Sequence, residues 1–404
     1  MCLCGGFAAL LAWSDHVRAQ SRPSSAGRWV TAWGTSQHAL GDTRLTNATV
    51  RLIARTTISG EAVRLRFDNT FGTEPVSLAG VRVGHRARGA ALVAGSNRAV
   101  TFNGSAGAVI PAGGTISSDP TPLQVFAHQD LAVSVHVSSS NVRPSQHTNA
   151  YTTSYRGADG SGDATTSDGD TPFSATTTAM WWLKAIDVQT TASPGVVVAF
   201  GDSITDGTCS TVDAHDRWVD LLSLRLGLER PGQSPAIVNE GIGGNTVTAT
   251  GLTPPPDSPP GLQRLERDVL SHHGVSQVIL FMGTNDIRRG ATATAVIQGT
   301  AAIIQRIKAT GSRVIGATII PRHNVPPTAT NSGWNDEKSR TRNEVNQWIR
   351  TGAGFDAVLD FAQIVRDPSD TDRLLPRFNC GDGIHPSVLG YHEMGKAIDL
   401  SLFR

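Results

Sequence analysis

The stretch "VVVAFGDSITDG", residues 196–207, decides the fold of the second half of this chain. Five consecutive apolar residues, Val196–Phe200, run directly into a Gly-Asp-Ser turn. A strand that is apolar at every position is typical of a parallel sheet covered on both faces. Ligands of such sheets bind beyond the carboxyl ends of the strands, where Ser203 would lie. Because strands commonly end in a polar turn, a functional role for Ser203 needs further evidence from the rest of the sequence.

Beyond residue 196, apolar strands alternate with helical patterns, which is typical of a doubly wound α/β domain. The predicted strands are Val196–Phe200, Ala236–Asn239, Gln277–Met282, Arg313–Ile320 and Ala357–Phe361. The predicted helices lie around 217–227, 262–273, 293–311 and 337–352, with Gly227 and Gly311 as helix stops. Right-handed crossovers between five such strands predict a flavodoxin-like three-layer α/β/α domain over 195–404.

The first half of the chain has a different pattern. Between about 28 and 190, polar and apolar residues alternate in short runs that are separated by Gly, Asn, Ser and Pro, which predicts an antiparallel, jelly-roll-like β-sandwich domain. The polar, glycine-rich segment between 155 and 180 is expected to be a long surface loop. The stretch "MWWLKAIDVQT", 180–190, is expected to close the sandwich, and Ser193-Pro194 marks the domain boundary.

Composition narrows the classes of partner. The chain has 404 residues, 39% of them hydrophobic, which is enough for two domains with their own cores. Lys and Arg number 35 against 34 Asp and Glu, and no basic run occurs. A nucleic acid or an anionic membrane surface is therefore not an expected partner.

The first 20 residues, "MCLCGGFAALLAWSDHVRAQ", predict a secretory signal peptide. Residues 2–13 form a short apolar run, and Val17-Arg18-Ala19 resembles a small-residue cleavage site. The usual basic residues before the run are missing, and a frayed N-terminal segment is the alternative. Elsewhere no stretch approaches the ~18 apolar residues of a membrane helix. A secreted protein without a membrane span is expected.

Four loops are expected to meet at the carboxyl edge of the parallel sheet. They contain Ser203, "NEGIGGNT" at 239–246, "MGTNDI" at 282–287 and "CGDGIHPS" at 380–387. Each loop carries a residue type that acyl transfer needs, and no such type is required merely to turn the chain. Their common placement favours a catalytic role for the serine.

These four blocks, "GDSITDG", "GIGGN", "GTND" and "DGIH", resemble the SGNH or GDSL hydrolase family over roughly 195–404. Ile204 stands where the family's short name has leucine, which is a packing-level change. A GxSxG elbow is absent, which disfavours the larger α/β-hydrolase fold. The resemblance implies a serine esterase with a three-layer α/β/α fold.

Residue types and the resemblance together assign a catalytic site. Ser203 would be the nucleophile, His385 its general base, and Asp382 the group that orients the imidazole. The backbone N–H groups of Ser203 and Gly244 and the side-chain amide of Asn285 would form the oxyanion hole. The alternatives are a histidine that caps the terminal helix, a glycine that only turns the chain, and an asparagine that bonds its own backbone.

Other polar residues near these motifs receive structural assignments. Asp202 and Asp286 are expected to bond loop amides, and Asp206 to cap the helix that follows. His272 and His273 are expected to form a solvated pair at a helix end. Because the sequence has no HExxH motif and no carboxylate cluster, neither a catalytic metal nor any other cofactor is expected.

The positions of the four cysteines are consistent with the fold that the resemblance implies. Cys2 and Cys4 lie in the predicted signal peptide, whereas Cys209 and Cys380 lie on loops that this fold brings to one face. In an exported protein these two are expected to form a disulfide between the catalytic loops, with two buried thiols as the alternative.

A β-sandwich before such a hydrolase resembles the architecture of secreted carbohydrate esterases. The expected substrates are short acyl esters, above all O-acetyl groups on polysaccharides; the alternatives are a lipase or aryl esterase, or a non-catalytic carbohydrate-binding protein. Loops 248–262 and 321–335 are expected to line the cleft. Four tryptophans near the sandwich strands suit either sugar stacking or, more commonly, packing: Trp29, Trp33, Trp181 and Trp182.

Overall fold

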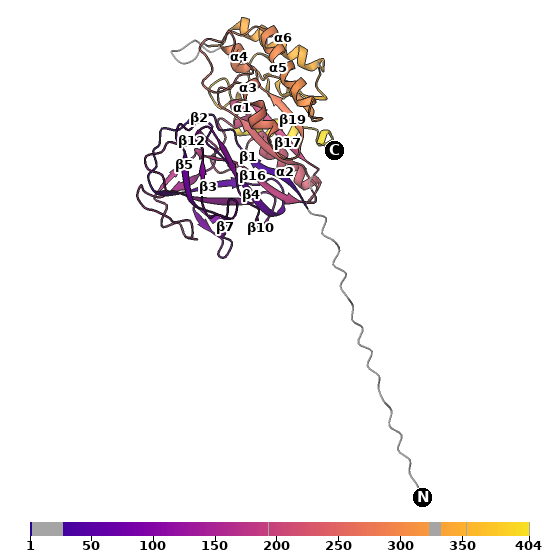
Figure 1. Ribbon diagram of the computed structural model, residues 1–404. Helices are drawn as coiled ribbons and strands as arrows, with labels where there is room; N and C mark the ends of the chain where they lie inside the picture. Colours follow the sequence, from indigo (N-terminus) through magenta and orange to yellow (C-terminus); the bar gives the residue numbers. More distant parts are fainter. Residues whose placement is uncertain (2–26, 193, 323–332, 353, 404) are drawn as a thin grey trace.

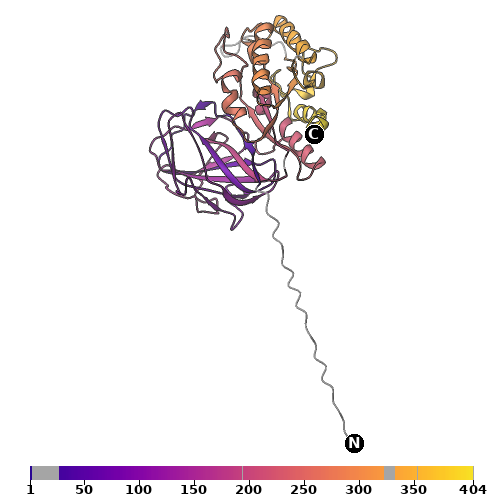
Figure 2. The same cartoon turned by 45° about the vertical axis from the view of Figure 1, so that its right-hand side comes forward.

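The computed structural model describes residues 27–192, 194–322, 333–352 and 354–403, together with Met1. The predicted signal peptide apart from Met1, with Cys2 and Cys4, lies outside the described residues, as do Ser193 and most of loop 321–335. Figure 1 shows a domain of antiparallel strands beside a domain in which helices surround a second sheet, and Figure 2 shows the same two parts from another side.

The second domain is built on a parallel five-stranded sheet with the predicted flavodoxin-like topology. Its strands are β17 (Val196–Gly201), β18 (Ala236–Gly241), β19 (Val275–Phe281), β20 (Arg313–Ala317) and β21 (Ala357–Leu359). Their spatial order is β18-β17-β19-β20-β21, and every neighbouring pair is parallel. The fold class expected from the strand pattern is thereby confirmed.

Strand β19 ends one residue earlier than expected, at Phe281, and two other strands end two or more residues early. Strand β20 stops at Ala317 because the backbone N–H of Ile319 donates to the Asn346 side chain rather than to a neighbouring strand. Strand β21 stops at Leu359 because the next residue, Asp360, caps helix α7 (Phe361–Val365).

Strand β17 is apolar throughout because it has a hydrophobic layer on each face. Val196, Val198 and Phe200 belong to one core, whereas Val197 and Ala199 belong to the other. This alternation is the period of two that every strand imposes on its side chains.

Helices cover both faces of the parallel sheet (Figure 1). On the Phe200 side lie α3 (Gly261–Leu265), the π-helical turn η1 (Glu266–Leu270), α5 (Ala293–Lys308) and α6 (Asp336–Arg350). On the Ala199 side lie α2 (Trp218–Glu229), α7 and α8 (Val388–Ala397). Helix α4 (Thr284–Arg288) follows β19, and the 3-10 turns η2 (Pro376–Phe378) and η3 (Leu400–Phe403) flank α8.

Gly227 does not stop α2, which continues to Glu229. A Cβ atom at this position would lie 3.1 Å from Nε2 of His128, a residue of the first domain. The glycine is therefore better explained by close approach of the two domains than by helix termination. Gly311, in contrast, follows α5 closely and has a φ of 83°.

The first domain consists of antiparallel sheets, as the alternating pattern predicts. One sheet has the order β1-β16-β4-β10 with β9 on β4; a second has the order β14-β13-β3-β11-β5-β6 with β7 and β8 on β5; a third has the order β15-β12-β2. The strands are β1 (Arg28–Gly34), β2 (Ala39–Leu40), β3 (Ala48–Arg55), β4 (Gly60–Asp68), β5 (Val76–Arg88), β6 (Ala91–Leu92), β7 (Arg98–Val100), β8 (Ala108–Ile110), β9 (Thr115–Ser117), β10 (Thr121–Val125), β11 (Asp130–Val137), β12 (Ser145–His147), β13 (Ser154–Arg156), β14 (Ala175–Thr177), β15 (Met180–Trp181) and β16 (Leu183–Thr190).

The segment expected to be one long surface loop is shorter and better anchored than predicted. Strands β13 and β14 form its two ends and pair with each other. Ser167 and Gly169 lie in the segment that connects these two strands. Their carbonyl oxygens accept hydrogen bonds from the buried guanidinium of Arg51, at 2.6 Å and 3.3 Å respectively. A buried cation needs such acceptors, so Arg51 holds the loop against the sheet.

Of the two roles expected for the four tryptophans, packing is the one that most of them have. Trp181 and Trp182 are 2% and 1% exposed and belong to the core. Trp29 is half-buried beneath the Arg64 guanidinium, 4.1 Å from the ring centre. Trp33 lines a cavity between the two domains.

The two domains share one hydrophobic core. The cluster that contains Val30 and Ala32 of β1 also contains Val198 and Val238 of the parallel sheet. Gly34 at the end of β1 permits this contact, because a Cβ there would lie 2.7 Å from Oε1 of Glu240 and 2.8 Å from Cγ1 of Val238.

Among the helices of the described residues, none has both the length and the apolar run that a bilayer crossing requires.

The close approach at Gly34 predicts a specific instability. Gly34→Ala is expected to lower the free energy of unfolding by about 1–3 kcal/mol, because the added methyl group overpacks the shared core. Denaturant unfolding of the full chain would measure this. Gly169→Ala, at an exposed site whose nearest atom to a new Cβ is 3.9 Å away, is the matched control. Equal stability of the two variants would contradict the close packing inferred here.

Candidate functional site

The carboxyl end of β17 turns sharply into helix α1 (Ser203–Asp206). Asp202 caps this single turn, since its side chain accepts the backbone N–H of Ile204 at 3.0 Å. Gly201 allows the turn because a Cβ there would lie 2.1 Å from Oγ1 of Thr205. The turn places Ser203 at the sheet edge with its residue 8% exposed.

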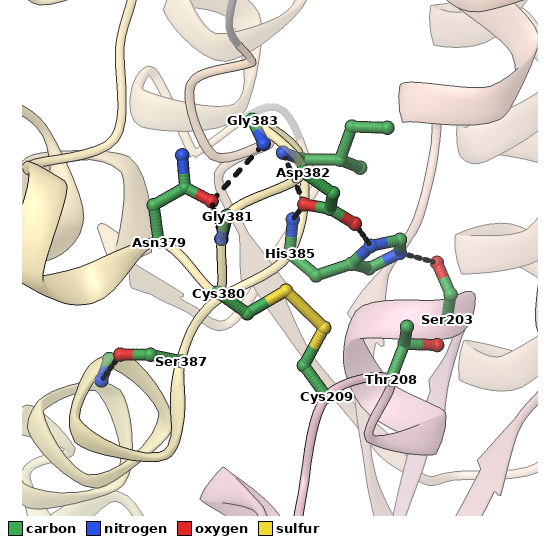
Figure 3. The surroundings of a disulfide bond; sticks show 12 residues. Ser203, Thr208, Cys209, Asn379, Cys380, Gly381, Asp382, Gly383, His385 and Ser387 are labelled. Carbon is green, nitrogen blue, oxygen red and sulfur yellow. Dashed lines mark hydrogen bonds and ion pairs between the residues drawn. A yellow bond between two sulfur atoms is a disulfide. The ribbon is translucent and has the colours of Figure 1, made fainter.

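Ser203, His385 and Asp382 form one hydrogen-bonded line (Figure 3). The Ser203 Oγ lies 2.9 Å from His385 Nε2, and the His385 Nδ1 lies 2.5 Å from Asp382 Oδ2. The other carboxylate oxygen of Asp382 accepts the backbone N–H groups of Ile384 and His385, each at 2.8 Å. The carboxylate is thus held in place while it orients the imidazole.

The environment of Asp382 keeps this carboxyl ionised. Partial burial by itself would raise its pKa, but hydrogen bonding and charge from His385, helped by the backbone N–H groups, lower the pKa to about 2. Asp382 therefore remains a carboxylate throughout the neutral range.

A disulfide joins the loops that carry Ser203 and His385. Cys209 and Cys380 are bonded, with their Cα atoms 6.3 Å apart (Figure 3). Asn379, next to Cys380, accepts the backbone N–H groups of Gly381 at 2.8 Å and Gly383 at 3.1 Å. The bond and the asparagine together brace the loop that presents the histidine.

The three expected oxyanion-hole donors lie on adjacent loops. Gly244 has a φ of 72°, a conformation that favours glycine. The Asn285 side-chain N–H₂ donates one hydrogen to the Asn245 carbonyl at 3.0 Å, which leaves its second hydrogen for another acceptor. Among the described residues, the backbone N–H groups of Ser203 and Gly244 have no acceptor.

Asp202 and Asp286 bond loop amides, as expected. Asp286 is buried and accepts the backbone N–H groups of Val247, at 2.9 Å, and Thr248, at 3.1 Å. Burial raises the pKa of both carboxyls to about 7, with the charge of Asp286 contributing to the shift of Asp202. They contrast with Asp382, whose pKa moves in the opposite direction.

Two expectations about polar residues are wrong. Asp206 ends α1 instead of capping the next helix, whose N-cap is Arg217, because its carboxylate is taken up by His147 and Gly243. His272 is 5% exposed rather than solvated, with Nε2 2.7 Å from Glu240 Oε1.

The neighbouring His273 lies 2.9 Å from Asp187 of the first domain. Domain packing therefore turns both histidines into interface residues, which the helix-end position alone could not reveal.

Arg264, which none of the sequence motifs indicates, is fully buried behind the site. Its guanidinium donates to the Gly201 carbonyl at 2.8 Å, to the Glu240 carbonyl at 2.9 Å and to the Asn245 side chain at 3.0 Å. Burial lowers its pKa to about 10, so the group stays charged. The available signal was the Arg264/Asp268 pair, spaced by four on the apolar stripe of its helix.

Arg322 is a second buried cation that the motifs do not indicate. It is 3% exposed, and its guanidinium carbon lies 5.2 Å from the centre of the Trp334 ring. Burial lowers its pKa to about 10, while the charges of Asp382 and Asp202 oppose that shift. Arg322 thus contributes positive potential beside the carboxylates of the site.

Cys209, Asp382 and His385 form the one cluster of metal-ligand type within the described parts of the chain. The cysteine sulfur is in a disulfide, and the other two side chains bond each other. This donor set does not suit a metal ion, because the thiolate that would bind it is unavailable.

The disulfide predicts a joint effect on stability and turnover. The double variant Cys209→Ser/Cys380→Ser is expected to lose about 2–5 kcal/mol of unfolding free energy, since the bond closes a loop between positions 171 residues apart. Ester hydrolysis is expected to fall as well, because the histidine loop is released. Thermal unfolding and initial rates would measure both. An unchanged rate would show that the loop needs no covalent brace.

The raised pKa of Asp286 predicts a pH-dependent stability. Protonation of this buried carboxyl stabilises the fold fully below pH about 4, and the contribution is lost as the pH rises through about 7. Between pH 5 and 8, Asp286→Asn is expected to gain about 1–3 kcal/mol relative to the parent protein. Denaturant unfolding at both pH values would measure it, with the exposed Asp42→Asn as control. A parallel decline in parent and variant would contradict the assignment.

Residues 199–393 match the model of the GDSL-like Lipase/Acylhydrolase family. No match was found among curated proteins.

Similar solved structures include a G-D-S-L family protein from Desulfitobacterium hafniense DCB-2, with 22% identity, TM-score 0.39, and coverage of 50% of this chain and 97% of that chain. A carbohydrate acetylesterase family member from Sinorhizobium meliloti has 16% identity, TM-score 0.41, and coverage of 52% and 97%. The M. smegmatis aryl esterase has 18% identity, TM-score 0.40, and coverage of 50% and 95%. The family match identifies a GDSL-like lipase/acylhydrolase domain at residues 199–393 and indicates a carboxylic ester hydrolase.

Proposed function

We propose that the protein is a secreted serine esterase that forms an acyl-enzyme on Ser203, with a sandwich domain at 28–190 and a hydrolase domain at 195–404. The observation that carries this proposal is the unbroken hydrogen-bond line from Asp382 through His385 to Ser203. Such a line gives a serine hydroxyl the base it lacks by itself.

The geometry supports a two-step reaction. His385 Nε2 takes the proton from Ser203 as its Oγ attacks the ester carbonyl, and the resulting imidazolium is stabilised by Asp382. Collapse of the tetrahedral intermediate expels the alcohol, which receives that proton. His385 then deprotonates a water that attacks the acyl-enzyme, and the carboxylic acid leaves as Ser203 regains its proton.

Three donors are assigned to the oxyanion. The backbone N–H groups of Ser203 and Gly244 have no acceptor among the described residues, and Asn285 retains a free amide hydrogen. Preorganised donors of this kind stabilise the negative charge that develops in the transition state, at about 2.7–4 kcal/mol for each donor removed.

The proposed substrates are short acyl esters, above all O-acetyl groups on polysaccharides. An open groove of about 630 Å³ adjoins the loop that follows the oxyanion loop, and its lining does not include Ser203 or His385. It lies between loop 248–262, including Pro256 and Pro259, and the first-domain residues His38 and Phe71. Asn245 binds the same loop through Ser258 at 2.9 Å, which connects the groove to the oxyanion loop.

Secretion is supported by the Cys209–Cys380 disulfide, since disulfides persist in oxidising compartments.

The test is hydrolysis of a p-nitrophenyl ester series from acetate to palmitate, followed by acetate release from acetylated xylan. Ser203→Ala is expected to lower kcat by a factor of about 10⁴ or more, because the acyl-enzyme cannot form. Ser276→Ala, at the opposite end of the sheet, is the matched control.

The chain-length profile decides among substrate classes. Activity confined to short esters, with acetate release, supports the proposal. A preference for long acyl chains would instead indicate a lipase. Activity on the short p-nitrophenyl esters without acetate release from acetylated xylan would indicate an aryl esterase. Polysaccharide binding that survives Ser203→Ala, without hydrolysis by the parent protein, would favour a non-catalytic binding protein.

A further inference from the structure

The first domain reaches the nucleophile's helix through one buried histidine. His147 ends strand β12 and is 2% exposed. Its Nε2 lies 3.0 Å from Asp206 Oδ1, and Asp206 is the last residue of helix α1, which begins with Ser203. The contact therefore joins the sandwich to the single helical turn that carries the proposed nucleophile.

The surroundings of His147 require a doubly protonated ring. Nδ1 lies 2.9 Å from the Ser36 carbonyl, and Nε2 faces both the Asn149 carbonyl at 3.1 Å and the Asp206 carboxylate. All three partners are acceptors, whereas a neutral imidazole offers only one N–H. Both ring nitrogens must donate, so His147 is an imidazolium.

His272 provides an internal contrast. Its Nδ1 lies 2.8 Å from the Arg66 guanidinium, a donor, and its Nε2 lies 2.7 Å from the Glu240 carboxylate, an acceptor. One donor and one acceptor suit the neutral ring, and burial lowers the pKa of His272. The geometry thus favours a charged ring for His147 and a neutral ring for His272.

The charged groups around His147 agree with the imidazolium. Burial disfavours the charge, but the carboxylate of Asp206, supported by that of Glu240, outweighs it and raises the pKa of His147. The His38 ring packs edge-on at 5.1 Å, and burial together with the charge on His147 lowers the pKa of His38 to about 3. The nearby cations Arg264 and Arg267 act on His38 in the same direction.

Asp206 passes this interaction to the oxyanion loop. While Oδ1 faces His147, Oδ2 accepts the backbone N–H of Gly243 at 3.2 Å. Gly243 directly precedes Gly244, a proposed oxyanion donor. One carboxylate therefore connects a cation of the first domain, the helix of the nucleophile and the loop of the oxyanion hole.

We propose that His147 is a positioning residue for ester hydrolysis, supplied by the sandwich domain, which as an imidazolium orients Asp206 and through it the Gly243–Gly244 loop. This inference rests on the proposed function. With this role for His147, the sandwich domain contributes to catalysis and is not an independent binding module.

Loss of the second ring proton of His147 would weaken its contact with Asp206. A neutral His147 would set a nitrogen lone pair against an oxygen, so the positioning is complete below the usual histidine pKa and is lost as the pH rises through the raised pKa of the folded protein. His147 and Asp206 both line the cavity of about 380 Å³ between the domains, which is large enough to hold water.

The kinetic test compares His147→Gln and Asp206→Asn with the parent protein, using p-nitrophenyl acetate from pH 5 to 10. Both variants are expected to lower kcat about 10–100-fold with KM within about twofold, as misplacement of a transition-state donor does. The alkaline decline of the parent protein is expected to disappear in both. His136→Gln, on β11 with its Nε2 on Asn47, is the matched control.

A role in stability alone gives a different result. The variants would then unfold at lower temperature but retain the parent pH profile and kcat, and this outcome would overturn the proposal.

A second measurement needs neither folded variants of His147 nor ester hydrolysis. In the full chain labelled with ¹⁵N, the His147 ring is expected to show two protonated nitrogens at pH 7, and the Gly243 amide to shift with the same midpoint as the ring. A neutral His147 ring at pH 6, or a Gly243 amide that ignores its titration, would overturn the proposal. A chain that hydrolyses no ester yet shows the coupled titration would instead refute the proposed function alone.

Discussion

The buried guanidinium of Arg264 is the constraint on which the site depends. A cation without solvent must find acceptors for its N–H groups, and here four of these acceptors come from different positions in the chain. They are the carbonyl ends of β17 and β18, the side chain of Asn245, and Ser36 of the first domain, 2.9 Å away. The Arg264 guanidinium also lies over the Phe200 ring, 4.2 Å from its centre. The strand ends before the nucleophile and the oxyanion loop are consequently held in one arrangement.

The same physical chemistry makes the two domains a single unit. Their shared hydrophobic core takes the polar groups next to it out of water, and these groups then require partners. Glu240 meets this requirement with Ser36, at 2.5 Å, and His272, at 2.7 Å, while Lys184 of β16 donates to the Arg267 carbonyl at 2.6 Å. A carbohydrate-binding module on a flexible tether would not need such a network.

Three aspartates of the site illustrate how environment divides one residue type into different roles. Asp382 is partly exposed and hydrogen-bonded to a histidine, so its pKa is low and it remains charged. Asp202 and Asp286 are buried with backbone donors, and burial raises their pKa values to about 7. Only the first is suited to stabilise an imidazolium, and the other two shape the loops.

The sequence by itself determined the parallel sheet and the loops at its edge. The apolar run before Ser203 and the alternation of strands and helices express local periodicity, and the topology of parallel strands then collects Ser203, Gly244 and Asn285 at one edge. His385 reaches this edge from the loop before α8. Only the tertiary structure decided what Asp206, His147, His272 and Arg264 do. Their partners lie on the other domain or on distant strands, such as the Asp206–His147 pair, 59 positions apart. Local patterns carry no information on such pairs, because packing between domains decides which polar groups lose water and which acceptors replace it.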